Sequence, residues 1–241
     1  ETEYNNFRRG LELFDKEKYG AAQKVFADLV EKINDPTNEA SVNAEYYLAI
    51  CGVYLFNRDA DFLLRDFIEK HPESPRVEDA YYQLGIFNYR KRKWDNAIHW
   101  FKQVDPYKLS QTENHDYTFK YGYALFEIES FEEASQKFFS IKDVDNAYAA
   151  PAQYYFAHIA YQDEQNQTAL EAFQKLEGHE QFGPVVPFYI SQLLYKQKKF
   201  DELIEYAPPL LENNNTKRAE EISRLIGESY YGKQQYAEAI P

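Results

Sequence analysis

The chain has 241 residues and a formal net charge of −13, from 40 acidic and 27 basic side chains. This length is sufficient for one large domain or for a repeat array with a substantial core. A negative field of this size repels phosphate backbones, so we expect no nucleic-acid partner. Aromatic residues make up 17% of the chain, whereas it holds only 9 glycines and 10 prolines. Because turn residues are scarce, we expect a mostly helical protein and not an all-β fold.

The cysteine and methionine content bears on compartment and processing. Cys51 is the only cysteine, which excludes an intrachain disulfide and a cysteine zinc cluster. No apolar run approaches the roughly 18 residues that span a bilayer, so we expect no direct membrane insertion of this chain. The sequence starts at Glu1 and contains no Met. We therefore expect a fragment of a longer protein.

A spaced pattern of small and aromatic residues recurs along the chain. In the first copy Gly10 is followed by Ala22 twelve positions later and by Phe26 four positions after that. A second copy has Ala49 in the small position and drifts by one residue near Phe62. The remaining copies are Gly85/Ala97/Phe101, Gly122/Ala134/Phe138, Ala157/Ala169/Phe173, Ser191/Leu203/Ala207 and Gly227/Ala239. The copies are separated by about 34 to 38 residues, which is typical of a helix-turn-helix repeat.

The pattern has a physical meaning in stacked helical hairpins. The small residues allow two helix axes to approach closely, and interior glycines such as Gly85 are acceptable where close packing offsets their cost. Trp94, Phe131 and Phe200 follow the turn and should hold the two helices of a hairpin together. A single hairpin cannot bury its apolar stripe, whereas stacked hairpins share one core. The last unit breaks off at Ile240-Pro241, so we expect the array to continue.

The unit around Gly85 resembles the tetratricopeptide repeat (TPR) family. It reads Tyr81-x2-Leu84-Gly85, then Ala97-x3-Phe101, and closes with Pro106, while Asn88 departs from the usual Tyr. The resemblance implies an all-α fold, a right-handed superhelical solenoid. Residues 1–241 would form a single array of about six repeats plus the start of a seventh. It also implies a non-enzymatic scaffold for protein–protein interaction.

In this family the first helix of each repeat lines a concave groove, with positions 2, 5, 9, 12 and 13 pointing into it. Position 12 is aromatic in most repeats. Position 5 is also aromatic, and its occupants are Phe7, Tyr46, Tyr82, Phe119, Tyr154 and Phe188. The implied partner-binding residues are Tyr46, Asp79, Tyr82, Ile86, Tyr89, Arg90, Asp116, Phe119, Tyr123, Phe126, Tyr154, His158, Tyr161, Phe188, Gln192 and Tyr195.

Two interpretations of these aromatic columns are open. The rings pad the inner wall between repeats, or they bind a protein or peptide segment, to which aromatic side chains are well suited. The Lys/Asn pattern with which some family members grip a C-terminal carboxylate is missing. A docking or regulatory arm of an enzyme outside this fragment is an alternative function, and a glycan-binding groove is another.

Two stretches are similar to repeat proteins of bacterial cell envelopes, in which a Pro-Ser-Pro-like start precedes an Ala-x-Tyr-x-Leu-Gly helix. They are HPESPRVEDAYYQLG, from His71 to Gly85, and APAQYYFAHIAY, from Ala150 to Tyr161. The similarity implies a periplasmic or envelope location, with the cytoplasm as the alternative. The oligomeric state is left open.

No catalytic constellation is visible, and we predict no catalytic residues, metal site or cofactor. The basic run Arg90–Lys93 is interpreted as a helix end, where cations complement the helix dipole. The stretch GESYYGKQ, residues 227–234, matches part of a phosphate-binding loop but lacks the Ser or Thr after Lys233. The stretch DVDN, residues 143–146, lacks the Gly and the distal Glu of a calcium loop. Cys51 is expected to be an inert core residue.

Overall fold

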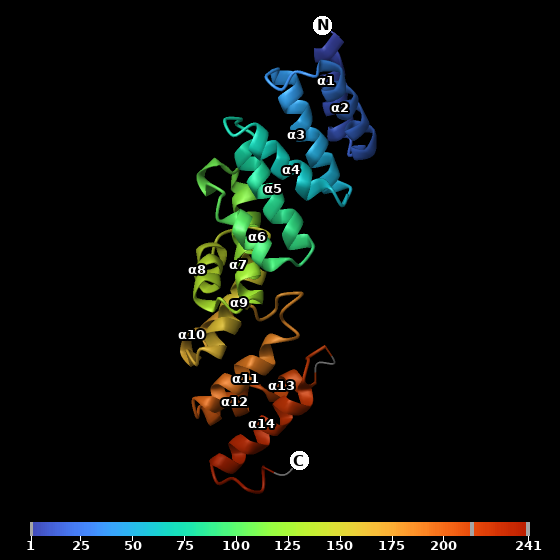
Figure 1. The fold of residues 1–241 in the computed structure, drawn as a ribbon. Helices are drawn as coiled ribbons and strands as arrows, with labels where there is room; N and C mark the ends of the chain where they lie inside the picture. Colours follow the sequence, from blue (N-terminus) through green and yellow to red (C-terminus); the bar gives the residue numbers. More distant parts are fainter. Residues whose placement is uncertain (1, 213–214, 240–241) are drawn as a thin grey trace. The chain divides into compact units, whose positions relative to one another are not determined.

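The computed structural model describes residues 2–212 and 215–239, and this part of the chain is helical, with connecting turns (Figure 1). The chain folds into two compact units, Glu1–Ile128 and Glu129–Pro241. The division falls between the two helices of the predicted fourth repeat. Ile240 and Pro241, where the last repeat breaks off, lie outside the described residues.

The first unit consists of successive helical hairpins. Its elements are α1 (Thr2–Asp15), α2 (Tyr19–Ile33), α3 (Glu39–Tyr54), α4 (Ala60–Lys70), α5 (Val77–Arg90), α6 (Trp94–Phe101), the 3-10 turn Pro106–Lys108 and α7 (Gln111–Glu127). Sequential helices pack against one another, and the first helices of neighbouring hairpins also touch, as in α1 with α3 and α5 with α7. Helix α7 begins at a capping box, in which Ser110 and Glu113 satisfy each other's backbone amides.

The second unit repeats this arrangement. Its elements are α8 (Phe131–Ile141), α9 (Ala149–Gln162), α10 (Asn166–Gln174), α11 (Val186–Lys196), α12 (Phe200–Tyr206), α13 (Pro208–Leu211) and α14 (Ala219–Gly232). Helices α9 and α10 pair, as do α11 and α12, and α14 packs against both α11 and α12. The predicted all-α class and the helix-turn-helix pairing are confirmed.

The small residues lie where the sequence pattern predicts close packing. A Cβ atom on Gly85 would lie 2.3 Å from Cε1 of Phe101, and one on Gly10 would lie 2.5 Å from Cε1 of Phe26. Both phenylalanines are fully buried, as is Ala97. We call the contact between the small residue of the first helix and the aromatic of the second the seam of a hairpin. In the hairpins of Gly10 and Gly85 the seam leaves no room for a methyl group.

Each hairpin turns at a residue in the left-handed backbone conformation. These corner residues are Glu17, Phe56, Arg92, Glu129, Glu164, Lys198 and Gln234. At the third corner the amide of Arg92 donates to the carbonyl of Tyr89 at 2.9 Å, and that of Lys93 donates to Asn88 at 3.0 Å. This is a Schellman motif, which satisfies carbonyls at a helix C-terminus. Every corner lies seven residues after the small position of its repeat.

The corners locate the irregularity of the second repeat. Ala49 and Phe56 keep the seven-residue spacing, but the first buried residue of α4 is Ala60, four residues after the corner instead of five. The drift predicted near Phe62 therefore arises because this repeat has one residue fewer between its corner and the first buried residue of its second helix. Phe62 itself is exposed, and the buried aromatic of this helix is Phe67.

The structure confirms the interpretation of the sequence stretches that resemble sites. Arg90 is the last residue of α5 and Lys91 is its C-cap, so the basic run is a helix end. The stretch from Gly227 lies within α14 up to Gly232 and then turns at Gln234, so it does not form a phosphate-binding loop. Cys51 is fully buried, and this burial raises the pKa of its thiol to about 12.

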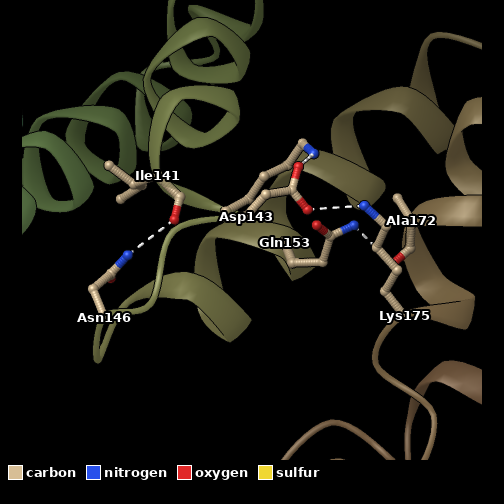
Figure 2. Close-up of polar contacts among 7 residues, drawn as sticks. Ile141, Asp143, Asn146, Gln153, Ala172 and Lys175 are labelled. Atoms are coloured by element: carbon tan, nitrogen blue, oxygen red, sulfur yellow. Dashed lines mark hydrogen bonds and ion pairs between the residues drawn. The ribbon is translucent and has the colours of Figure 1, made fainter.

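The turn between α8 and α9 is held by the protein's own polar groups (Figure 2). The Asn146 side-chain amide donates to the carbonyl of Ile141 at 3.0 Å, and Lys175 Nζ lies 2.8 Å from a carboxylate oxygen of Asp143. Lys142 also pairs with Asp143. Hydrogen bonds from the two lysines lower the pKa of the Asp143 carboxyl. Because Asp143 is paired with two cations, this turn is not built as a calcium loop.

Candidate interaction surface

A polar network connects α5 with α7 in the first unit. The Tyr82 hydroxyl donates to Oδ2 of Asp116 at 2.7 Å, and Lys120 Nζ lies 2.6 Å from Oδ1 of the same carboxylate. All three side chains are at least partly buried. Tyr82 and Asp116 both belong to the predicted groove residues, which are called the wall from here on. They contact each other across neighbouring repeats.

Three aromatic rings meet beside this network. Tyr89 of α5, Trp94 of α6 and Tyr123 of α7 have ring centroids 5.5 to 5.8 Å apart and nearly perpendicular ring planes. Phe119 and Phe126 adjoin Tyr123 at 6.3 and 6.5 Å. The rings are only partly buried. Since edge-to-face pairs fix one ring against the next, this cluster forms a rigid, partly exposed aromatic surface.

Asp79 lies near the beginning of α5 among other acids. It lines a cavity of about 460 Å³ together with Glu73, Glu78 and Glu113, and Lys108 is the cation of that lining. Lys108 pairs with Glu78 at 2.9 Å. Burial, with a smaller contribution from Glu113, raises the pKa of Asp79 from 3.8 to about 6. Asp79 thus destabilises the fold in its charged form.

The second unit has a similar wall with fewer charges. The Tyr161 hydroxyl donates to the side-chain oxygen of Gln192, and Lys196 Nζ lies 4.6 Å from the centre of the Tyr161 ring. His158 lies 6.2 Å from Tyr154 between ring centroids, and burial lowers the pKa of His158. Tyr195 contacts Phe200 at 5.7 Å, as the predicted stapling role of Phe200 requires.

Several predicted groove residues are buried by their own unit. Tyr46, Tyr82, Ile86 and Phe188 are each less than a tenth exposed. Arg218 covers the ring of Phe188 at 3.5 Å, and in the same unit Phe182 stacks on the ring of Tyr154 at 4.9 Å. These residues support the wall but offer little contact area. Arg90 is exposed, and its guanidinium lies 4.2 Å from the Phe56 ring. Partner binding by the remaining residues stays a prediction.

Sequence reasoning missed the residues that pad the joints between repeats. Tyr47 stacks on Phe26 at 5.3 Å, Tyr155 on Phe138 at 5.4 Å and Tyr189 on Phe173 at 4.8 Å. In each case a tyrosine one position after the predicted groove residue meets the seam phenylalanine of the preceding repeat. The recurrence of Tyr at this position is a signal that the sequence contains. Rings at position 12 also meet the next repeat, as Tyr89 does with Tyr123 and Tyr161 with Tyr189, while they stay partly exposed.

In residues 2–212 and 215–239 no group of three or more His, Cys, Asp or Glu side chains is arranged to hold a metal ion. No helix among those described is both long and apolar enough to cross a membrane.

Comparison with solved structures identifies the fold. The structure of a tetratricopeptide repeat protein from Parabacteroides merdae aligns with 98% of this chain over 89% of its own length, with 10% sequence identity and a TM-score of 0.59. The fold is that of tetratricopeptide repeat structures. MamA AMB-1 covers 70% of this chain and 88% of its own, with 19% identity and a TM-score of 0.57. A chain from the structure of Naa15/Naa10 bound to HypK-THB covers 99% of this chain, at 13% identity and a TM-score of 0.61, and this chain spans 36% of it. No protein-family model and no curated protein matches the sequence.

Proposed function

We propose that the protein is a non-enzymatic scaffold that binds a segment of a protein partner along its aromatic walls. The observation that carries the proposal is the partly exposed cluster of Tyr89, Trp94 and Tyr123. These rings hold one another in place, so a partner that covers them loses little side-chain entropy on the scaffold side. A chain of similar fold is present in a structure of a complex, Naa15/Naa10 bound to HypK-THB, which is compatible with such a role. The proposed bacterial cell-envelope location rests on the sequence stretches that start at His71 and Ala150.

Replacement of two wall rings tests the proposal. Tyr89→Ala combined with Tyr123→Ala removes exposed aromatic area without touching the fully buried seam. Bait carrying these changes should lose a partner that the unmodified protein captures from an extract of its source, as identified by mass spectrometry. The partner's binding segment is then mapped with overlapping peptides.

A matched control separates the wall from exposed aromatics in general. Tyr107→Ala combined with Phe139→Ala also removes two rings, which are 96% and 62% exposed and lie outside the predicted wall. This variant should retain the partner. Equal capture by both double variants, with unchanged thermal melting, would contradict the proposal.

A further inference from the structure

The corner of the second repeat differs from the other corners. Phe56 takes the left-handed conformation with φ 61°, where the other six corner residues are Glu, Arg, Lys or Gln. A bulky apolar residue is rare in this conformation. Phe56 is 41% exposed, and the two residues before it, Tyr54 and Leu55, are 45% and 41% exposed. Three consecutive large apolar side chains therefore meet solvent at a position that is otherwise polar.

Neighbouring corners surround this apolar triplet. The Tyr54 ring stacks on Tyr19 at 4.5 Å, which ties it to the first corner, and Phe56 contacts Phe87 at 5.6 Å beneath the guanidinium of Arg90, next to the third corner. The turns between α1 and α2, α3 and α4, and α5 and α6 follow one another along one side of the ribbon (Figure 1). The three corners of the first unit, at Glu17, Phe56 and Arg92, thus form one surface, here called the corner surface.

The corner surface is basic although the chain is strongly acidic. Its turns contain seven cations and the acids Asp15, Glu17 and Asp59; the cations are Lys16, Lys18, Arg58, Arg90, Lys91, Arg92 and Lys93. Across the described ranges, none of these seven forms an ion pair with a carboxylate. A local excess of unpaired positive charge around exposed apolar groups is typical of an interaction surface for an anionic partner.

We propose that the corner surface binds an acidic segment of a protein partner that also carries aromatic or aliphatic side chains. This is a second interaction surface, distinct from the aromatic walls. Carboxylates would pair with the cations of the third corner, and the apolar side chains would cover Leu55 and Phe56.

The geometry favours a protein segment over an anionic membrane. The rings of Tyr54 and Phe56 are held against Tyr19, Phe87 and Arg90, so they present a fixed surface and not free side chains that could enter a bilayer. An anionic bilayer is also repelled by the whole chain, whose net charge is −13. A short acidic segment meets only the local patch, because charges beyond roughly 8–10 Å are screened at physiological salt.

The test uses fluorescently labelled poly(Glu,Tyr), a soluble acidic polymer with aromatic groups, and measures its anisotropy with the complete chain. Binding should weaken as salt is raised. The variant Lys91→Gln/Arg92→Gln/Lys93→Gln should weaken binding by about tenfold, since exposed ion pairs each contribute modestly. Leu55→Gln/Phe56→Gln should weaken it as well. All variants are first checked by circular dichroism melting.

The control variant Lys24→Gln/Lys32→Gln/Lys102→Gln removes the same charge from exposed positions of the same unit, away from the corners. It should bind like the unmodified chain. Three results would overturn the proposal: no binding of the polymer, equal weakening by both triple variants, or corner-dependent binding of phosphatidylserine vesicles or single-stranded DNA in preference to the polymer.

Discussion

The two faces of α5 obey different constraints. On the seam face, Gly85 meets the fully buried ring of Phe101 with no space for a methyl group. On the wall face, Asp79 lies near other carboxylates and the Tyr82 hydroxyl donates to Asp116. The ring of Tyr89 contacts two other rings. The seam face is determined by shape, so a small residue, Gly, Ala or Ser, recurs at this position in the other repeats. The wall face is determined by local chemistry, so it can differ between repeats without loss of the fold.

A methyl group on the seam face should produce the largest effect. Gly85→Ala places a Cβ 2.3 Å from Phe101, which is fully buried and cannot move aside. Overpacking of this kind should cost about 2–3 kcal/mol of unfolding free energy, more than the gain in helix propensity. Urea denaturation followed by circular dichroism measures it.

Gly20→Ala is the matched control, because nothing lies within 4 Å of a Cβ at that helical position. It should leave stability unchanged or raise it by about 0.5 kcal/mol. If both substitutions had the same effect, the close contact at the seam would not be what selects glycine.

A charge change on the wall face should produce a smaller effect that depends on pH. Burial raises the pKa of Asp79 from 3.8 to about 6, so the folded state binds its proton more tightly than the unfolded state does. The contribution of this group to stability therefore falls as pH rises from about 4 to about 6 and is constant above that. Asp79→Asn removes the penalty and should stabilise the protein by about 2 kcal/mol at neutral pH.

At about pH 3, where Asp79 is largely protonated in both states, the Asn variant and the unmodified protein should have nearly equal stability. Urea denaturation at the two pH values gives the comparison. A gain of the same size at both would mean that the effect comes from packing and not from charge.

The difference between the faces also explains what the sequence could predict. A seam that accepts only small residues leaves a periodic mark, and Gly10, Gly85 and their counterparts therefore predicted the repeat and its packing. The wall leaves a weaker mark, because the spacing of its tyrosines does not specify their surroundings. Tyr46 is buried, Tyr89 is partly exposed, and Tyr47 stacks on Phe26 of the preceding repeat. The network of Tyr82, Asp116 and Lys120 depends on side-chain directions that spacing does not specify. The corners leave no mark, because Glu, Phe, Arg, Lys and Gln all occupy the same backbone conformation.

A substitution at a corner residue should produce the smallest change in stability. A non-glycine residue in the left-handed conformation is strained by about 1–2 kcal/mol. Glycine removes this strain, but its larger entropy loss on folding offsets part of the gain. Glu164→Gly, at the corner between α9 and α10, should therefore stabilise the second unit by about 0.5–1 kcal/mol. Glu164→Val should destabilise it, because a branched Cβ fits this conformation worst. If thermal melting ranked Val above Gly, the corner would not be held by the Schellman motif, and the regular spacing of corners would have another cause.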